Sequence, residues 1–238
     1  MSAVDPPASE LARTIDTLYA VFARYPAAER VEGCPCCMSA ADHAELGRAP
    51  LRPMAVPLLR RYAFKAMTTW GDAGDFKHFL PAIWDRMSRG ELEIDEQTIH
   101  GKLPYASWAQ WPERERAAIV AVTHAWLRAA LGGDRAWLLD TIVESAGHAG
   151  IPVAPLIEIA ETSAGPYLAN AIAGLAGRLQ GTERFAWIWW KTDREQLLAR
   201  WVRERGPAKL ETALREHPSH VDAWRWSAAL DALAWPAR

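Results

Sequence analysis

Residues 112–150, PERERAAIVAVTHAWLRAALGGDRAWLLDTIVESAGHAG, decide the fold class of this 238-residue chain. Apolar side chains in this stretch recur at spacings of three and four residues, which predicts two helices rather than strands. The first helix is expected to open at Pro112, since proline is favoured at a first helical position, and to end at Gly132. Asp134 is expected to cap the second helix. The side chains predicted to face inward are Ile119, Val122 and Trp126 in the first helix and Trp137, Leu138, Thr141, Ile142 and Ser145 in the second.

The rest of the chain continues this pattern of helices separated by Gly and Pro, and strand signals are scarce. We therefore predict an all-α fold of about ten helices, an irregular array of αα-hairpins that resembles a helical repeat. One domain, 1–238, is expected, with a division into a cysteine-loop half, 1–111, and an αα-hairpin half, 112–238, as the alternative. Pro81 predicts either a short turn before a main helix or one kinked helix. Other expected helices cover 8–24, 39–47, 55–69, 153–162, 166–179, 184–191, 193–205, 207–216 and 220–234, with a short one after Asp95.

Composition argues against several classes of function. The net charge is -2, so the basic footprint of a nucleic-acid-binding protein is absent. No apolar run reaches the roughly 18 residues that a membrane helix needs, and residues 1–25 lack the pattern of a signal peptide. We therefore expect a cytoplasmic protein with no nucleic-acid or membrane partner, whose cysteines stay reduced or bind metal. Most of the 13 Trp residues are expected to fill the helical core.

All three cysteines lie in the segment Gly33-Cys34-Pro35-Cys36-Cys37, which is expected to be a loop. Thiolates are good ligands for zinc and other soft or borderline metals. Three thiols within four residues can converge on one ion, and Gly33 and Pro35 favour a tight loop around it. The sequence therefore predicts a zinc site that includes Cys34, Cys36 and Cys37.

Zinc in a structural site usually has four ligands, so the cysteine cluster lacks one. His43 is the histidine nearest in sequence, six residues after Cys37, and His78 is the second choice. Residues three apart share a face of a helix, so His78 is expected on the same face as Asp75. The structural alternatives are a solvent-facing His43 on a short helix and an Asp75 that caps a helix.

Other interpretations of this region stay open. The cysteines could be small buried hydrophobic side chains, or they could form a strained disulfide that acts as a redox switch. No βαβ pattern of a thioredoxin-like oxidoreductase accompanies them, which ranks redox function below metal binding. A ligand pocket could be lined by Trp70, Asp72 and Asp75, with Lys77 and His78, although a packed helix connection is the simpler interpretation.

Two stretches resemble a known family: the loop Gly33-Cys-Pro-Cys-Cys37 followed by Ser39, and the segment 62–81, YAFKAMTTWGDAGDFKHFLP. Through them, residues 15–110 are similar to the N-terminal third of an uncharacterised family of bacterial helical proteins. That family has no known activity, so the resemblance implies an α-helical fold and nothing catalytic. The Cys-Pro-Cys-Cys string also resembles small cysteine-rich bacterial domains thought to bind zinc, a similarity limited to the three cysteines themselves.

These observations favour a non-catalytic metal-binding or interaction protein, whose helical array presents a surface for another protein. In this interpretation the zinc ion is structural, and either His43 or His78 completes the site. The alternative is an enzyme or thiol-redox protein that uses the cysteines beside the turn at residues 72–78.

Overall fold

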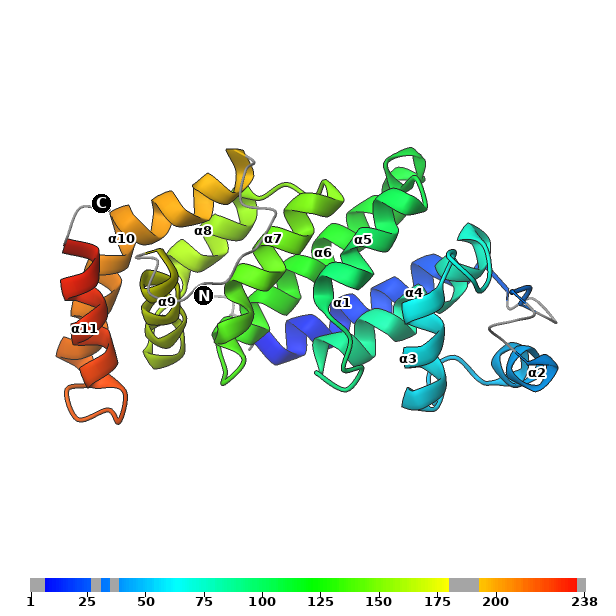
Figure 1. Ribbon diagram of the computed structural model, residues 1–238, viewed down its shortest axis with the longest axis horizontal. Helices are drawn as coiled ribbons and strands as arrows, with labels where there is room; N and C mark the ends of the chain where they lie inside the picture. The colour runs from blue at the N-terminus through cyan, green and yellow to red at the C-terminus, as the bar shows by residue number, and fades with distance from the viewer. Residues whose placement is uncertain (1–6, 27–30, 35–38, 180–192, 235–238) are drawn as a thin grey trace, which may run out of the picture. The chain divides into compact units, whose positions relative to one another are not determined.

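The computed structural model describes residues 7–26, 31–34, 39–179 and 193–234. These residues form eleven α-helices and two short 3-10 helices (Figure 1), together with two isolated β-bridges and no strand. The prediction of an all-α fold is therefore confirmed, and the number of helices is close to the expected one. The repeat-like arrangement stays a prediction, and the expected helix 184–191 lies outside the described residues.

The chain forms two compact units. The N-terminal unit contains the residues up to Thr123 together with His148–Gly150, and the C-terminal unit contains His124–Gly147 and the residues from Ile151 onward. Two helices therefore contribute to both units: α6 (Glu113–Leu131) and α7 (Leu139–Ala149). The choice between one domain and a division at 111/112 stays a prediction.

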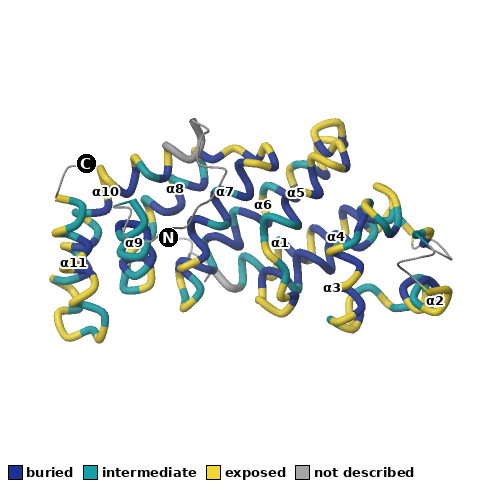
Figure 2. The backbone as a smooth tube through the Cα atoms, viewed as in Figure 1, coloured by how far each residue is buried: buried dark blue, intermediate teal, exposed yellow. Residues whose placement is uncertain are grey.

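The helices of the N-terminal unit are α1 (Pro7–Phe22), α2 (Ala40–Arg48), α3 (Val56–Lys65), α4 (Ala73–Ser88), α5 (Glu96–Tyr105) and η1 (Trp108–Gln110), with the first part of α6. α4 packs against both α1 and α3, and α5 packs against α3 and η1. Ten of the sixteen residues of α4 are buried, and Figure 2 shows this burial along most of the helix. α4 is therefore the centre of this unit, whereas α2 buries only His43 and Leu46.

α3 is shorter than the predicted helix 55–69, because the chain turns at Met67, whose backbone φ is 63°. The last carbonyl groups of a helix have no partner within the helix. Here Lys102 Nζ, from α5, donates hydrogen bonds to the carbonyl oxygens of Phe64 and Ala66 at 2.9 and 2.8 Å. The prediction was therefore wrong over its last turn, where a buried lysine closes the end of α3.

The helices of the C-terminal unit are η2 (Ala136–Leu138), α8 (Ala154–Thr162), α9 (Pro166–Leu179), α10 (Asp193–Glu216) and α11 (Ala223–Ala234), with the remaining parts of α6 and α7. α9, α10 and α11 pack against one another. Asn170 joins α9 to α11 and to the turn before it, because its side chain accepts from Trp226 Nε1 at 2.7 Å and donates to Asp222 Oδ2 at 2.9 Å.

Prolines lie inside two long helices. α4 runs through Pro81 as a single helix, so the alternative of a short turn before a main helix was wrong, and the kink stays a prediction. α10 runs through Pro207, so the prediction of separate helices 193–205 and 207–216 was wrong. Proline removes one hydrogen bond from a helix, but buried side chains on both sides of Pro207 hold the two halves against the rest of the unit. These side chains are Leu198, Trp201, Val202, Leu210 and Ala213.

Trp137 is the exception among the side chains predicted to face inward. It is 63% exposed, whereas Trp126, Ile142 and Ser145 are buried as expected. The reason is local, since residues 136–138 form a 3-10 helix rather than an α-helix. A 3-10 helix has about 3.0 residues per turn instead of 3.6. The face predicted from α-helical spacing therefore does not include Trp137.

Candidate functional site

The cysteine loop begins in a short backbone pairing with the turn after α3. Gly33 forms an antiparallel β-bridge with Trp70, and the Cys34 N–H donates to the Thr69 carbonyl oxygen at 2.8 Å. A Cβ atom added at Gly33 would lie 3.0 Å from Thr69 O and 3.1 Å from Trp70 Cδ1. This close approach favours glycine at position 33, and it places Cys34 beside the Trp70 turn.

His43 of α2 is buried against the same loop. Its side chain is 3% exposed, so the interpretation of His43 as a solvent-facing residue is wrong. A Cβ atom added at Gly33 would lie 2.7 Å from His43 Cε1, which shows how closely the imidazole approaches the loop. The His43 and Trp70 rings meet edge to face with centroids 5.9 Å apart. The structure therefore brings this predicted ligand to the residue that precedes Cys34.

The two ring nitrogens of His43 have different surroundings. Nδ1 contacts the Val31 carbonyl oxygen, and the Trp70 indole nitrogen lies 3.2 Å from the same Nδ1. One nitrogen cannot donate to Val31 and accept from Trp70 together: a proton on Nδ1 donates to the Val31 oxygen, whereas a lone pair on Nδ1 accepts from Trp70 Nε1. In the tautomer with the proton on Nδ1, Nε2 carries the lone pair that a metal ligand needs. Histidines that bind metals commonly donate the other ring N–H to a backbone carbonyl.

Polar contacts fix the start of α2. Ser39 and Asp42 form a capping box, in which the Ser39 N–H donates to Asp42 Oδ2 at 2.9 Å and the Asp42 N–H donates to Ser39 Oγ at 3.2 Å. Hydrogen bonds from Ser39 lower the pKa of Asp42, and Arg61 of α3 adds to this effect through an ion pair. Leu46, which is fully buried, supplies apolar packing one turn later. α2 is thus attached through a few specific side chains.

Asp72 and Asp75 form a second capping box, at the start of α4. The Asp72 side chain accepts from the Gly74 and Asp75 backbone at 2.7 and 2.9 Å, and Asp75 Oδ2 accepts from the Asp72 N–H at 3.0 Å. Burial raises the pKa of Asp75, although the hydrogen bond from the Asp72 backbone opposes this shift. The interpretation of Asp75 as part of a helix cap is confirmed.

A cavity of 520 Å³ lies beside this cap. The cavity is lined by Cys34, Trp70, Asp72 and Asp75. The structure therefore brings one predicted metal ligand together with the three residues predicted to bind a small ligand. Cys34 itself is half-buried. The cavity therefore joins a sulfur atom to carboxylates and an indole, a mixture that suits either a metal ion or a polar ligand.

His78 lies in a different environment from His43. Its Nδ1 is 2.7 Å from the Tyr25 carbonyl oxygen, and its ring meets the Phe79 ring edge to face with centroids 4.6 Å apart. The His78 charge also acts on Asp75, as expected for residues on one helix face. Since the described contacts of His78 involve Tyr25 rather than Cys34 or Gly33, the geometry favours His43 over His78 as the fourth ligand.

Two of the predicted zinc ligands, Cys36 and Cys37, lie outside the described residues. Within the described part of the chain, no group of three or more His, Cys, Asp or Glu side chains is arranged to hold a metal ion. The zinc site with Cys34, Cys36, Cys37 and His43 or His78 therefore stays a prediction.

Sequence reasoning did not single out the hydroxyl group of Tyr62. Tyr62 is fully buried, with its ring centroid 5.6 Å from that of Trp70 and 4.4 Å from that of Phe79. Its hydroxyl has no hydrogen-bond partner in the part of the chain that the structure describes. Burial raises its pKa well above the usual range, and the charges of Asp75 and Asp72 add to the shift. Apolar periodicity carries no signal for such a hydroxyl.

The described residues include no helix that is both long and apolar enough to cross a membrane. Comparison of the chain with protein-family models, with curated proteins and with solved structures finds no match. The resemblance to a family of bacterial helical proteins therefore stays a prediction, and the case for function rests on the geometry around His43.

Proposed function

We propose that this chain is a cytoplasmic, non-catalytic binding protein that holds one structural zinc ion. The proposed ligands are Cys34, Cys36, Cys37 and His43. One observation carries the proposal: the His43 ring is buried beside the cysteine loop, with Nδ1 at the Val31 backbone carbonyl. This is the orientation that metal-binding histidines commonly adopt.

A zinc ion at this position would join two segments that the fold connects only weakly. The thiolates come from the loop that pairs with the Trp70 turn, and the imidazole comes from α2. α2 buries two of its nine residues, so packing supplies little of its attachment. Binding energy at a structural zinc site contributes directly to folding, and it would be used here to hold α2 in place.

The partner in this proposal is another protein. Helical arrays present extended surfaces that suit protein partners, and a net charge of -2 gives no basic footprint for nucleic acid. Membership of the bacterial helical family belongs to the same proposal, supported by the loop and the segment 62–81.

Elemental analysis tests the zinc proposal. Protein purified without added metal should contain about one zinc ion per chain. The variant Cys36→Ser should lose most of this zinc and should melt at a lower temperature than the unchanged chain. A zinc-free protein, or a variant with unchanged zinc content and melting temperature, would contradict the proposal.

A thiol-redox function is the second proposal, because Cys34 lines the same cavity as Asp72 and Asp75. In this case the number of reactive thiols in the metal-free protein should change reversibly between reduced and oxidised samples. A thiol count that does not change with redox conditions rules this function out.

A further inference from the structure

Two groups approach His43 Nδ1, and they require opposite states of this nitrogen. The Val31 carbonyl oxygen can only accept a hydrogen bond, so it requires a proton on Nδ1. The Trp70 indole N–H can only donate, so it requires a lone pair on the same nitrogen, which lies 3.2 Å away. A neutral imidazole carries one proton, so the two contacts correspond to its two tautomers. Only one contact at a time is a hydrogen bond.

Burial makes the choice between these two contacts costly. Val31, His43 and Trp70 are all buried, so the group that is left unpaired is shielded from bulk water. In folded proteins a buried N–H without an acceptor is rarer than a carbonyl oxygen without a donor. In the metal-free chain we therefore expect Nδ1 to accept from Trp70, while the proton of the ring is on Nε2.

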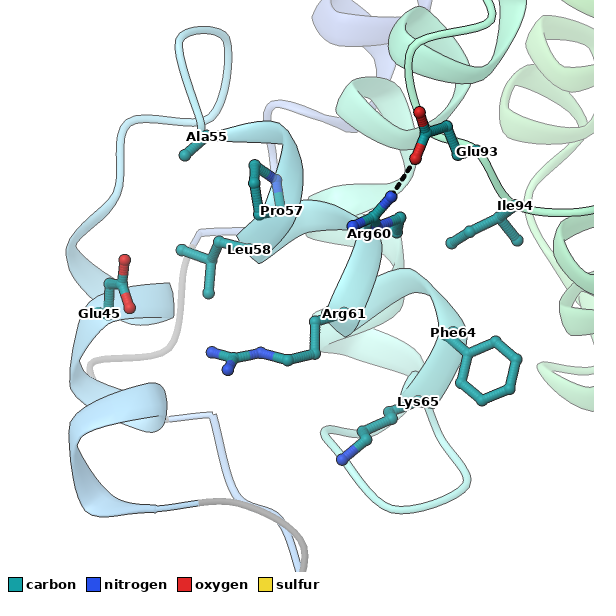
Figure 3. A pocket seen from close by; sticks show the side chains of 10 residues that line it. All are labelled: Glu45, Ala55, Pro57, Leu58, Arg60, Arg61, Phe64, Lys65, Glu93 and Ile94. Atoms are coloured by element: carbon teal, nitrogen blue, oxygen red, sulfur yellow. Dashed lines mark hydrogen bonds and ion pairs between the residues drawn. The ribbon is translucent and has the colours of Figure 1, made fainter.

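Other contacts hold the two rings in place. The Trp70 ring centroid lies 5.6 Å from that of Tyr62 and 5.9 Å from the guanidinium carbon of Arg61. Figure 3 shows Arg61 projecting from α3 toward α2, where it pairs with Asp42, the residue before His43. A change of partner at Nδ1 therefore needs a proton to move and not a ring.

Zinc binding at Nε2 requires the other tautomer, because this nitrogen must then offer a lone pair. His43 releases the proton of Nε2 to solvent and takes one up at Nδ1, so its net charge is unchanged. The Nδ1–H group donates to the Val31 oxygen, as metal-binding histidines commonly donate to a backbone carbonyl. The Trp70 N–H then loses His43 as its acceptor.

We propose that Trp70 is a positioning residue that competes with zinc for His43 and thereby lowers the zinc affinity of the site. One buried hydrogen bond is lost when zinc binds, and it forms again when zinc leaves. The site therefore exchanges zinc more readily than its four ligands alone would allow. This inference rests on the proposed zinc site and adds the means by which the chain regulates it.

Nitrogen-15 NMR of the metal-free full chain tests the tautomer of His43, whose signals are assigned by their absence from His43→Ala. Nδ1 should have the shift of an unprotonated nitrogen, and addition of zinc should make Nδ1 the protonated one. The Trp70 indole proton, assigned by its absence from Trp70→Phe, should move upfield as zinc breaks its hydrogen bond. A protonated Nδ1 in the metal-free chain, or an indole signal that zinc does not move, would overturn the proposal.

The zinc affinity of Trp70→Phe, measured by competition with a chromophoric chelator, is the second test. Phenylalanine keeps an aromatic ring and lacks the N–H, so this variant should bind zinc about tenfold more tightly than the unchanged chain. Trp111→Phe is the matched control, since Trp111 is also buried but donates to the Ala106 carbonyl oxygen at 2.9 Å. This control should leave the zinc affinity unchanged.

A role of Trp70 in packing alone predicts the opposite result, because a smaller ring would loosen the site and weaken zinc binding. Equal or weaker affinity in Trp70→Phe, with zinc bound by the unchanged chain, would therefore overturn this inference and leave the zinc site standing. An unchanged chain that binds no zinc would instead contradict the proposed function itself.

Discussion

α4 and α2 belong to the same unit and are held there by different forces. α4 buries ten of its sixteen residues between α1 and α3, so the removal of apolar surface from water stabilises it. α2 buries two of its nine residues and depends on a capping box, one ion pair and the imidazole of His43. The comparison teaches that apolar packing builds the frame of this unit, whereas specific polar contacts decide where α2 and the cysteine loop meet.

The largest expected effect comes from a cavity in the α4 core. Phe79 is fully buried, and its ring centroid lies 4.4 Å from that of Tyr62. The variant Phe79→Ala should lower the free energy of unfolding by about 3–5 kcal/mol in a urea titration. Phe64→Ala is the matched control on α3, because the Phe64 side chain is 63% exposed, and it should change stability by about 0.5 kcal/mol or less. Equal losses in the two variants would contradict the central role given to α4.

The pH dependence of the free energy of unfolding also tests the packing around α4. Burial lowers the pKa of His100 from 6.5 to about 4, and the His100 ring packs against Trp84 of α4. Between these two pH values the unfolded chain binds a proton that the folded chain does not. The free energy of unfolding should therefore fall, by up to about 3 kcal/mol, as the pH is lowered from 6.5 towards 4.

The variant His100→Phe isolates this contribution from the carboxyl groups that titrate in the same range. Urea titrations at several pH values should show a flatter dependence for His100→Phe than for the unchanged chain. Identical pH profiles would show that His100 is not held neutral in the folded state.

A smaller and more local effect is expected at the start of α2. The variant Ser39→Ala removes one side of the capping box, which typically costs about 1 kcal/mol. Hydrogen exchange of the α2 amides should become faster, while exchange in α4 stays the same, because α2 opens without the rest of the unit. Ser39→Asp is the control, since aspartate also caps helices. Faster exchange in both helices would mean that α2 is part of the same cooperative core.

The sequence predicted most of the helices because their positions depend on local periodicity. The spacing of apolar residues and the positions of Gly and Pro identified most helices, and α2, α6, α8 and α9 lie close to their expected ranges. Predictions were wrong where distant residues decide the outcome. α10 continues through Pro207 because both halves pack against other helices, and α3 ends where Lys102, from α5, reaches its carbonyl groups.

Sequence spacing was also insufficient to predict the geometry of the candidate site. Spacing alone named His43 as the nearest histidine to the cysteines, but it could not show that the ring is buried or that Nδ1 meets the Val31 carbonyl. Those facts depend on the pairing of Gly33 with Trp70, which joins segments that are far apart in sequence.

The most direct test of the central claim is the zinc-to-protein ratio of His43→Ala beside that of His78→Ala, measured by elemental analysis after identical purification. The account predicts about one zinc ion per chain in the unchanged protein and in His78→Ala, and a clear loss of zinc in His43→Ala. Zinc retained in His43→Ala, or absent from the unchanged protein, would contradict it.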